Sequence, residues 1–194
     1  MFERCNYFEL FGVSPAFFQD LDQLKHQYFE LQKKVHPDRF AGSSESERAA
    51  SLRQASYVNT AYDTLKDPVL RAGYLLSLAG VSLDIETNTS MAHDFLLKQM
   101  HWRETMEIIS EQNNPLEKGV SSCHASLSMF RTLQAEVEQE AQGKLEQVAR
   151  LFAASFSLAG IDPLVVGEMS NLVRELVFLK KLKEECMILA DQFD

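Results

Sequence analysis

Apolar residues recur along this chain at intervals of three and four positions, and no stretch alternates apolar and polar residues as a half-buried strand does. One such pattern opens at Asp20, which forms a capping-box sequence with Gln23, and ends at His36-Pro37 because proline cannot continue a helix. A second pattern opens at Ser44 and runs to about Lys66. The predicted apolar faces of these two helices comprise Leu21, Leu24, Tyr28, Leu31 and Val35, and then Ala49, Leu52, Ala55, Tyr57, Val58, Ala61, Tyr62 and Leu65.

Two shorter helical segments flank this pair. The first covers Asn6 to Phe11 and is stopped by Gly12. The second starts at Asp67-Pro68, where aspartate is a good N-cap and proline suits the first helical position, and it ends at Gly80. The N-terminal part of the chain is therefore expected to be a helical hairpin with short helices on either side.

A polar connection without helical period covers residues 81–90 and marks the predicted domain boundary. Beyond it, three long helical patterns cover about 91–111, 115–159 and 163–193. The short turn sequences between them imply antiparallel neighbours and hence a three-helix bundle, while Gly119 and Gly143 leave a break in the middle helix open. We therefore expect an all-α protein with one domain over 1–76, a linker and connecting helix end over 77–90, and a bundle over 91–194.

Charge and cysteine content narrow the classes of function. The formal net charge of −9 argues against binding of nucleic acid or of an anionic membrane by the protein as a whole, because both require a cationic face. No apolar run reaches the roughly 20 residues that a membrane-spanning helix needs. Cys5, Cys123 and Cys186 are odd in number, far apart and without a C-x-x-C pair, so neither a disulfide framework nor a zinc site is indicated. We expect a cytoplasmic protein, or one in an equivalent reducing compartment.

The tripeptide His36-Pro37-Asp38 is the most informative feature of the sequence. Proline has no place inside a helix, and it favours an extended backbone at the residue before it. The tripeptide lies between two helical patterns, so it presents an imidazole and a carboxylate at a forced bend. A carboxylate on such a bend is suited to binding an arginine side chain of a partner through two parallel hydrogen bonds.

A helix, a His-Pro-Asp loop and a second helix within the first 80 residues resemble the J-domain, through which co-chaperones stimulate DnaK-type ATPases. The resemblance extends to the HscB family, the J-type co-chaperones of iron–sulfur cluster assembly. Six segments carry it and together cover nearly the whole chain: Tyr7 to Gly12, His36 to Phe40, Asn59 to Pro68, Arg71 to Leu76, Phe95 to Met100 and Phe178 to Leu182.

The resemblance implies that Asp38 contacts an HscA-like, DnaK-type chaperone while His36 and Pro37 fix the loop. The cationic residues expected to steer that partner are Lys25, His26, Lys33, Lys34 and Arg39. The family usually has lysine where Arg39 stands, so the charge is kept although the two side chains are not equivalent. Taken one by one, the lysines are equally well explained as a solvated helix face.

A second predicted site lies in the C-terminal bundle. One apolar seam of the first bundle helix is explained by packing and comprises Phe95, Trp102, Met106 and Ile109. A further apolar cluster lies beside this seam and adjoins charged residues, which packing within the bundle does not explain. Phe178 lies outside the apolar seam of the last helix and among charged neighbours, which indicates an exposed anchor for a partner, unless the middle helix or domain packing covers it. By resemblance, the residues that bind the iron–sulfur scaffold protein are Leu96, Leu97, Met100, Arg103, Glu104 and Phe178.

The resemblance therefore implies a non-enzymatic co-chaperone that brings the iron–sulfur scaffold protein to its chaperone and stimulates the ATPase. We expect no cofactor and no metal ion, because the cysteine-rich N-terminal extension of some relatives is missing. Three alternatives remain open: a general J-protein that hands over unfolded clients, an enzyme that uses His36 or a free thiol, and a helical adaptor without an ATPase partner. A general J-protein would be indicated by a Gly/Phe-rich linker or repeated C-x-x-C pairs, and the sequence has neither. An enzyme would be indicated by a recognisable nucleophile setting, which is also absent from the sequence.

Overall fold

The computed structural model describes residues 5–40, 42–83, 92–112, 120–157 and 160–190. In these ranges the regular secondary structure is helical apart from two strands of two residues each, which confirms the predicted all-α class. Contacts divide the chain into one unit of residues 1–81 with 152–162 and another of residues 82–151 with 163–194. Half of the predicted linker, residues 84–90, lies outside the described residues, and the boundaries at 76 and 90 stay predictions.

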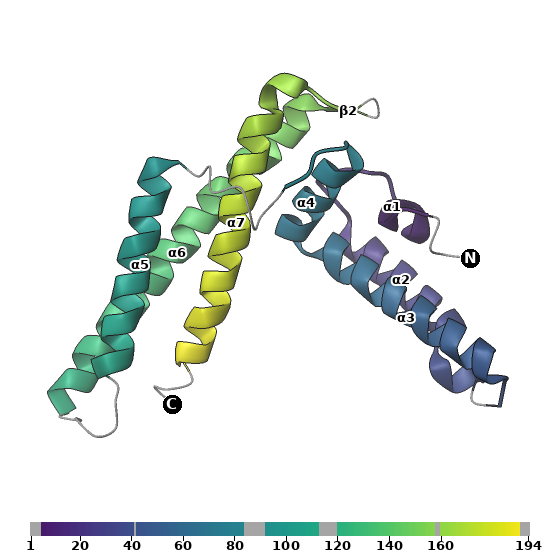
Figure 1. Ribbon diagram of the computed structural model, residues 1–194, viewed down its shortest axis with the longest axis horizontal. Coiled ribbons are helices and arrows are strands. Elements are labelled where there is room, and N and C mark those ends of the chain that lie inside the picture. The colour runs from purple at the N-terminus through teal and green to yellow at the C-terminus, as the bar shows by residue number, and fades with distance from the viewer. Residues whose placement is uncertain (1–4, 41, 84–91, 113–119, 158–159, 191–194) are drawn as a thin grey trace. The chain divides into compact units, whose positions relative to one another are not determined.

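The first unit contains α1 (Tyr7–Phe11), α2 (Leu21–Val35), the 3-10 turn η2 (Pro37–Phe40), α3 (Glu45–Lys66) and α4 (Pro68–Leu78). Antiparallel α2 and α3 form the hairpin in Figure 1. The predicted caps are present at three helix starts. The Asp20 carboxylate accepts hydrogen bonds from two backbone N–H groups of α2, Ser44 and Glu47 form a reciprocal capping box, and Asp67 caps α4.

The core of the first unit unites all four helices. Fully buried residues come from α1 to α4: Phe8, Leu24, Val58, Ala61, Leu65, Ala72, Leu75 and Leu76. Three predicted apolar-face residues are instead exposed: Leu21 by 48%, Leu52 by 62%, and the small Ala49. Leu21 is the first residue of α2. Ser51 and Ala55 take the buried face of α3, and Leu52 points about 100° away from Ser51, as successive helix positions do.

The second unit is a three-helix bundle of α5 (His93–Gln112), α6 (Val120–Ser155) and α7 (Pro163–Ala190), with α6 antiparallel to its two neighbours (Figure 1). Helix α6 continues through Gly143 without a break, while Gly119 lies outside the described residues. The predicted middle helix runs to about 159, but α6 ends at Ser155, and the backbone of β1 (Phe156–Ser157) pairs antiparallel with β2 (Gly160–Ile161). No helix in the described ranges is both long and apolar enough to cross a membrane.

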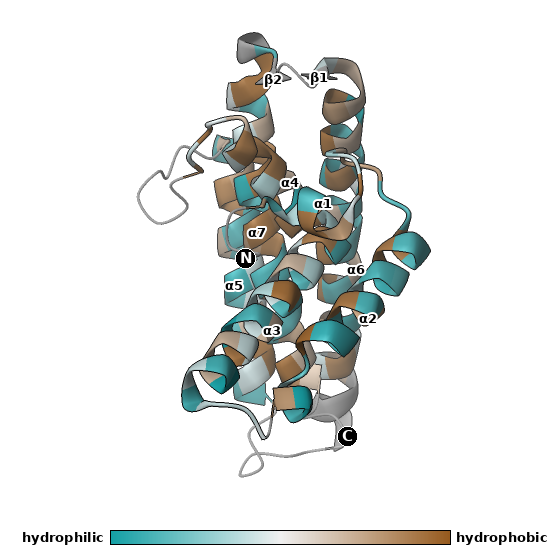
Figure 2. Cartoon of the chain, turned by 90° about the vertical axis from the view of Figure 1, so that its right-hand side faces the viewer, coloured by the Kyte–Doolittle hydropathy of each residue, from teal (hydrophilic) through white to brown (hydrophobic). Residues whose placement is uncertain are grey.

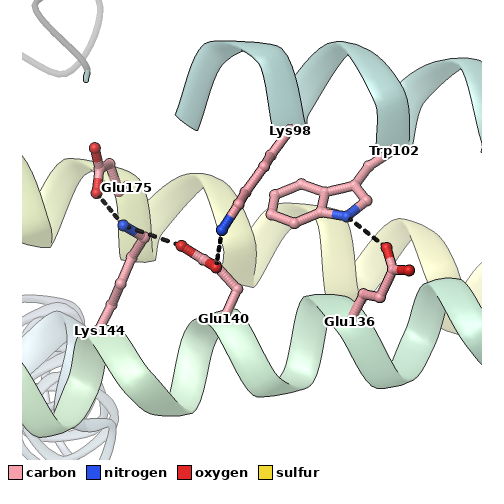
Figure 3. A network of polar contacts seen from close by, with 6 residues as sticks. All are labelled: Lys98, Trp102, Glu136, Glu140, Lys144 and Glu175. Atoms are coloured by element: carbon pink, nitrogen blue, oxygen red, sulfur yellow. Dashed lines mark hydrogen bonds and ion pairs between the residues drawn. The ribbon is translucent and has the colours of Figure 1, made fainter. Parts of the chain in front are cut away.

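A charged network crosses the bundle beside its apolar core (Figure 3). The Lys144 ammonium lies 2.5 Å from a Glu175 carboxylate oxygen and 3.2 Å from one of Glu140, which also accepts a hydrogen bond from Lys98. The side chain of Glu175 is only 4% exposed and that of Lys144 13%. Burial raises the pKa of Glu140, but the hydrogen bonds from Lys98 and Lys144 outweigh it and leave that pKa below the ordinary carboxyl value. The Lys144 ammonium also lies 4.7 Å from the centre of the Phe95 ring.

Candidate functional site

The bend at His36-Pro37-Asp38 is held in place by hydrogen bonds to the end of α2. That helix ends at Val35, His36 is extended with φ −59° and ψ 129°, and Pro37 opens the turn η2. The buried Ser51 hydroxyl of α3 donates to the Val35 carbonyl at 2.8 Å, and the Arg39 guanidinium donates to the Lys33 carbonyl at 2.9 Å. Carbonyls left without a partner at a helix end are therefore satisfied from outside the helix, which fixes the geometry of the bend.

Asp38 projects its carboxylate into solvent from this bend. Its side chain is 90% exposed. The backbone N–H of Asp38 donates to Nδ1 of His36 at 3.3 Å, and the same nitrogen lies 3.6 Å from Oδ2 of Asp38. His36 thus orients the residue, while the carboxylate stays accessible to an incoming guanidinium group.

The cationic residues lie on the outer face of α2, where Figure 2 shows mainly polar positions. Lys25, His26, Lys33 and Lys34 are exposed. Lys33 forms an ion pair of 2.7 Å with Glu30, and the hydrogen bond from Lys33 lowers the pKa of that carboxyl group. Arg39 adds charge to this face, but its guanidinium is also bonded to the backbone of α2, so it supports the bend. We call these five cationic residues, with Phe29 and Asp38, the α2 surface.

Phe29 is the residue of this surface that the sequence pattern does not single out. It is 50% exposed and lies between His26 and Lys33, which are three and four positions away along α2. These residues, with His36 and Arg39, border a hollow of about 660 Å³ next to the bend. An aromatic ring in the middle of a cationic face provides an apolar contact where the lysines provide only charge. The sequence signal that could have identified Phe29 is its position outside the apolar face of α2.

In the bundle, the structure brings together most of the predicted scaffold-binding residues along α5 and α7. Leu96 is 38% exposed and Met100 69%. The guanidinium of Arg103 binds the Glu185 carboxylate through two hydrogen bonds, of 2.8 and 3.3 Å. Leu97, 53% exposed, instead lines a separate hollow between α5 and α6 together with Trp102. Glu104 is exposed on α5.

The prediction that Phe178 is exposed is wrong, while its role in binding the scaffold protein stays a prediction. Its ring is half-buried and packs edge-to-face against the buried Phe95, with 5.9 Å between ring centres. The Arg103 guanidinium lies 5.7 Å from the centre of the Phe178 ring. Because α5 and α7 lie side by side here, the neighbouring helix covers a residue that one helical pattern alone places among charges. Phe178 is therefore part of the contact between α5 and α7. We call Leu96, Met100, Arg103 and Phe178 the α5/α7 surface.

No group of three or more potential metal-ligating side chains occurs among the residues that the structure describes. Cys186 is buried, and burial raises the pKa of its thiol, which disfavours the reactive thiolate. Cys5 is half-buried, and the side chain of Cys123 lies outside the described set.

Comparison with known proteins relates the whole chain to one group of proteins. Residues 6–74 match the family model of the DnaJ domain. The chain is 37% identical over 186 residues to the co-chaperone protein HscB homolog of Shewanella sp. (strain ANA-3), covering 96% of this chain and 97% of that protein. The corresponding protein of Shewanella woodyi is 36% identical over 180 residues, covering 93% of this chain and 94% of that protein.

Two solved structures are similar along most of the chain. The chaperone HscB from Vibrio cholerae superposes with a TM-score of 0.73 at 32% identity, covering 97% of this chain and 99% of that one. The human co-chaperone protein HscB also gives a TM-score of 0.73, at 22% identity, covering 96% of this chain and 82% of that one. The human protein supports the fold, and the bacterial proteins relate the sequence as well.

Proposed function

Because this chain belongs to the HscB family of J-domain co-chaperones, we propose that it binds an iron–sulfur cluster scaffold protein, delivers it to an HscA-like, DnaK-type chaperone and stimulates the ATPase of that chaperone. The observation that carries the proposal is the 90% exposed Asp38 carboxylate on a bend held by Ser51 and Arg39. The protein would act by docking and would assist the maturation of iron–sulfur proteins without catalysing a reaction itself.

The charge of the α2 surface supports the chaperone contact. The protein as a whole carries a net charge of −9, yet the outer face of α2 presents Lys25, His26, Lys33 and Lys34. A local cationic face on an acidic protein steers an acidic partner and gives fast, salt-sensitive association. Asp38 then engages an arginine of that partner, and this contact favours the conformation that hydrolyses ATP.

Phe29→Ala is expected to raise about tenfold the concentration of this protein needed for half-maximal ATPase stimulation. The substitution removes an exposed ring from the centre of the α2 surface, and a tenfold change corresponds to about 1.4 kcal/mol of docking free energy. Titration of the purified chaperone with each variant measures the effect. Phe18→Ala is the matched control, since Phe18 is 67% exposed and lies outside α2. Equal titration curves for wild type and both variants would remove Phe29 from the chaperone contact.

The α5/α7 surface supports the scaffold contact. Leu96 and Met100 expose apolar area on the solvent side of a folded bundle, and the half-buried Phe178 packs against the bundle core. Apolar side chains that stand among charges on a helix are typical of a protein-binding surface. Glu104, on the same stretch of α5, places a carboxylate at the edge of this surface.

The double variant Leu96→Ala with Phe178→Ala is expected to weaken scaffold binding by at least tenfold, measured by isothermal titration calorimetry. Phe178 also packs against Phe95, so unfolding followed by fluorescence of the single tryptophan, Trp102, checks the bundle. Met100→Ala provides a version free of this complication, because its side chain is 69% exposed. Wild-type affinity in both variants would refute the scaffold site.

Joining the two surfaces in one chain raises the effective concentration of scaffold near the chaperone and so couples delivery to ATP hydrolysis. We place this activity in the cytoplasm, with no role for nucleic acid or membrane. Affinity purification followed by mass spectrometry tests the proposal as a whole, with recovery of both a DnaK-type chaperone and the scaffold expected. Recovery of many unfolded clients instead would favour the general J-protein, and recovery of neither partner would favour a plain adaptor.

A further inference from the structure

A groove continues the α5/α7 surface towards the C-terminal ends of both helices. Helices α5 and α7 run parallel, since Phe95 contacts Phe178 and Arg103 contacts Glu185 at nearly the same spacing (Figure 1). Beyond the Arg103–Glu185 pair, a hollow of about 310 Å³ opens between the two helices. Because Arg103 borders both this hollow and the Phe178 ring, the two features form one continuous strip.

The side chains along this groove grade from buried to exposed. Leu189 is 6% exposed and belongs to the bundle core, and Met106 packs partly buried against the same core. Ile188 borders the groove yet is 69% exposed, as much as Met100 at the other end of the strip. Leu189 belongs to the core cluster of the bundle, whereas Ile188 does not. Its exposed area is thus available to a partner.

The charge along the strip indicates which partner chemistry fits. Glu107 borders the groove, and Glu104 and Glu111 are exposed on the same helix. Arg103, the cation among the residues that border the groove, is neutralised by its two hydrogen bonds to Glu185, so it does not repel a basic partner. An apolar side chain flanked by lysine or arginine is therefore complementary to this groove.

We propose that the scaffold-binding surface extends past the Arg103–Glu185 pair and ends on Ile188, with the scaffold protein placing an apolar side chain and adjacent basic residues in the groove. This inference rests on the proposed function and names the part of the bundle that the scaffold covers. It adds Ile188 as an apolar contact and Glu107 as an electrostatic one to the residues identified above.

Calorimetric titration with the cluster-free iron–sulfur scaffold protein tests the proposal. Ile188→Ser is expected to raise the dissociation constant about tenfold, and Met187→Ser to leave it within about twofold. Met187 is the matched control because it is 61% exposed on the same helix, but it lies about 100° around the helix axis and does not border the groove. Glu107→Lys is expected to weaken binding as well, whereas Glu146→Lys makes the same charge change on α6 and leaves it unchanged.

The outcomes separate this inference from the proposed function. If Met100→Ala weakens binding and Ile188→Ser does not, the extension is wrong while the scaffold site stands. If neither variant weakens binding, the scaffold site itself fails. Light scattering of wild type and Ile188→Ser tests the other occupant, a second copy of this chain: loss of a dimer in the variant, with scaffold affinity unchanged, would overturn the proposal. A monomer in both proteins together with weaker scaffold binding supports it.

Discussion

Asp38→Ala is expected to abolish stimulation of the chaperone ATPase while leaving affinity for the scaffold protein unchanged. The carboxylate is 90% exposed, so its removal takes away an acceptor for a guanidinium group without opening a cavity. The bonds that hold the bend come from Ser51 and Arg39, and the backbone N–H of Asp38 that bonds to His36 is retained in alanine. Steady-state ATPase assays with the purified chaperone, with and without scaffold, measure the effect.

Two further variants assign that loss to the charge of Asp38. Asp38→Asn keeps the shape of the side chain and removes its charge, so it should also fail to stimulate. Asp63→Ala removes one exposed carboxylate from α3 and should stimulate normally. Full stimulation by Asp38→Ala would count decisively against the co-chaperone mechanism. A decrease shared by Asp38→Ala and Asp63→Ala would instead indicate a response to net charge.

Lys144→Met is expected to lower the free energy of unfolding of the bundle by about 3–5 kcal/mol, the usual cost of removing one partner from a buried ion pair. Glu175 is 4% exposed and has its ion pair with Lys144, so the substitution leaves a buried carboxylate without its counter-charge. The contact between the ammonium and the Phe95 ring is lost as well. Urea unfolding followed by Trp102 fluorescence is the measurement, since this single, buried tryptophan belongs to α5 of the bundle.

Lys98→Met is the matched control for this prediction. Lys98 binds Glu140 of the same network, but its side chain is 51% exposed, so its loss should cost only about 0–1 kcal/mol. The double variant Lys144→Met with Glu175→Met should regain much of the lost stability, because no buried charge remains unpaired. Equal small effects of the two single lysine variants would show that the Lys144–Glu175 pair is effectively solvated.

Local signals in the sequence predict the helices of this protein and its bend. Helix caps and proline breaks act within three or four residues, so they can be predicted without knowledge of the tertiary structure. This applies to the caps at Asp20, Ser44 and Asp67 and to the break at Pro37. The exposure of Leu52 could not be predicted in the same way, because the small residues Ser51 and Ala55 occupy the buried face of α3. The spacing of apolar residues shows which residues share one face of a helix. It does not show which face packs against a neighbouring helix.

Contacts between distant parts of the chain explain the remaining differences. Phe178 packs against Phe95, which lies 83 positions earlier in the chain. The periodicity of neither helix predicts this contact. The Lys144–Glu175 pair likewise joins residues of two different helices. Strands of two residues, as in β1 and β2, are too short to leave an alternating pattern. The cationic residues and Asp38 of the α2 surface could be predicted because a single helix and its bend carry them, whereas the sequence pattern did not single out Phe29.

In the proposed co-chaperone role, the hydrogen bond from Ser51 to the last turn of α2 would affect the speed of the chaperone cycle. A docking loop already ordered in the free protein loses little conformational entropy when it meets its target. Recognition can then be selective through geometry although the total affinity stays low, and the complex can separate soon after each hydrolysis event. The serine of the second hairpin helix, only 3% exposed, would thus influence turnover through the geometry of the bend.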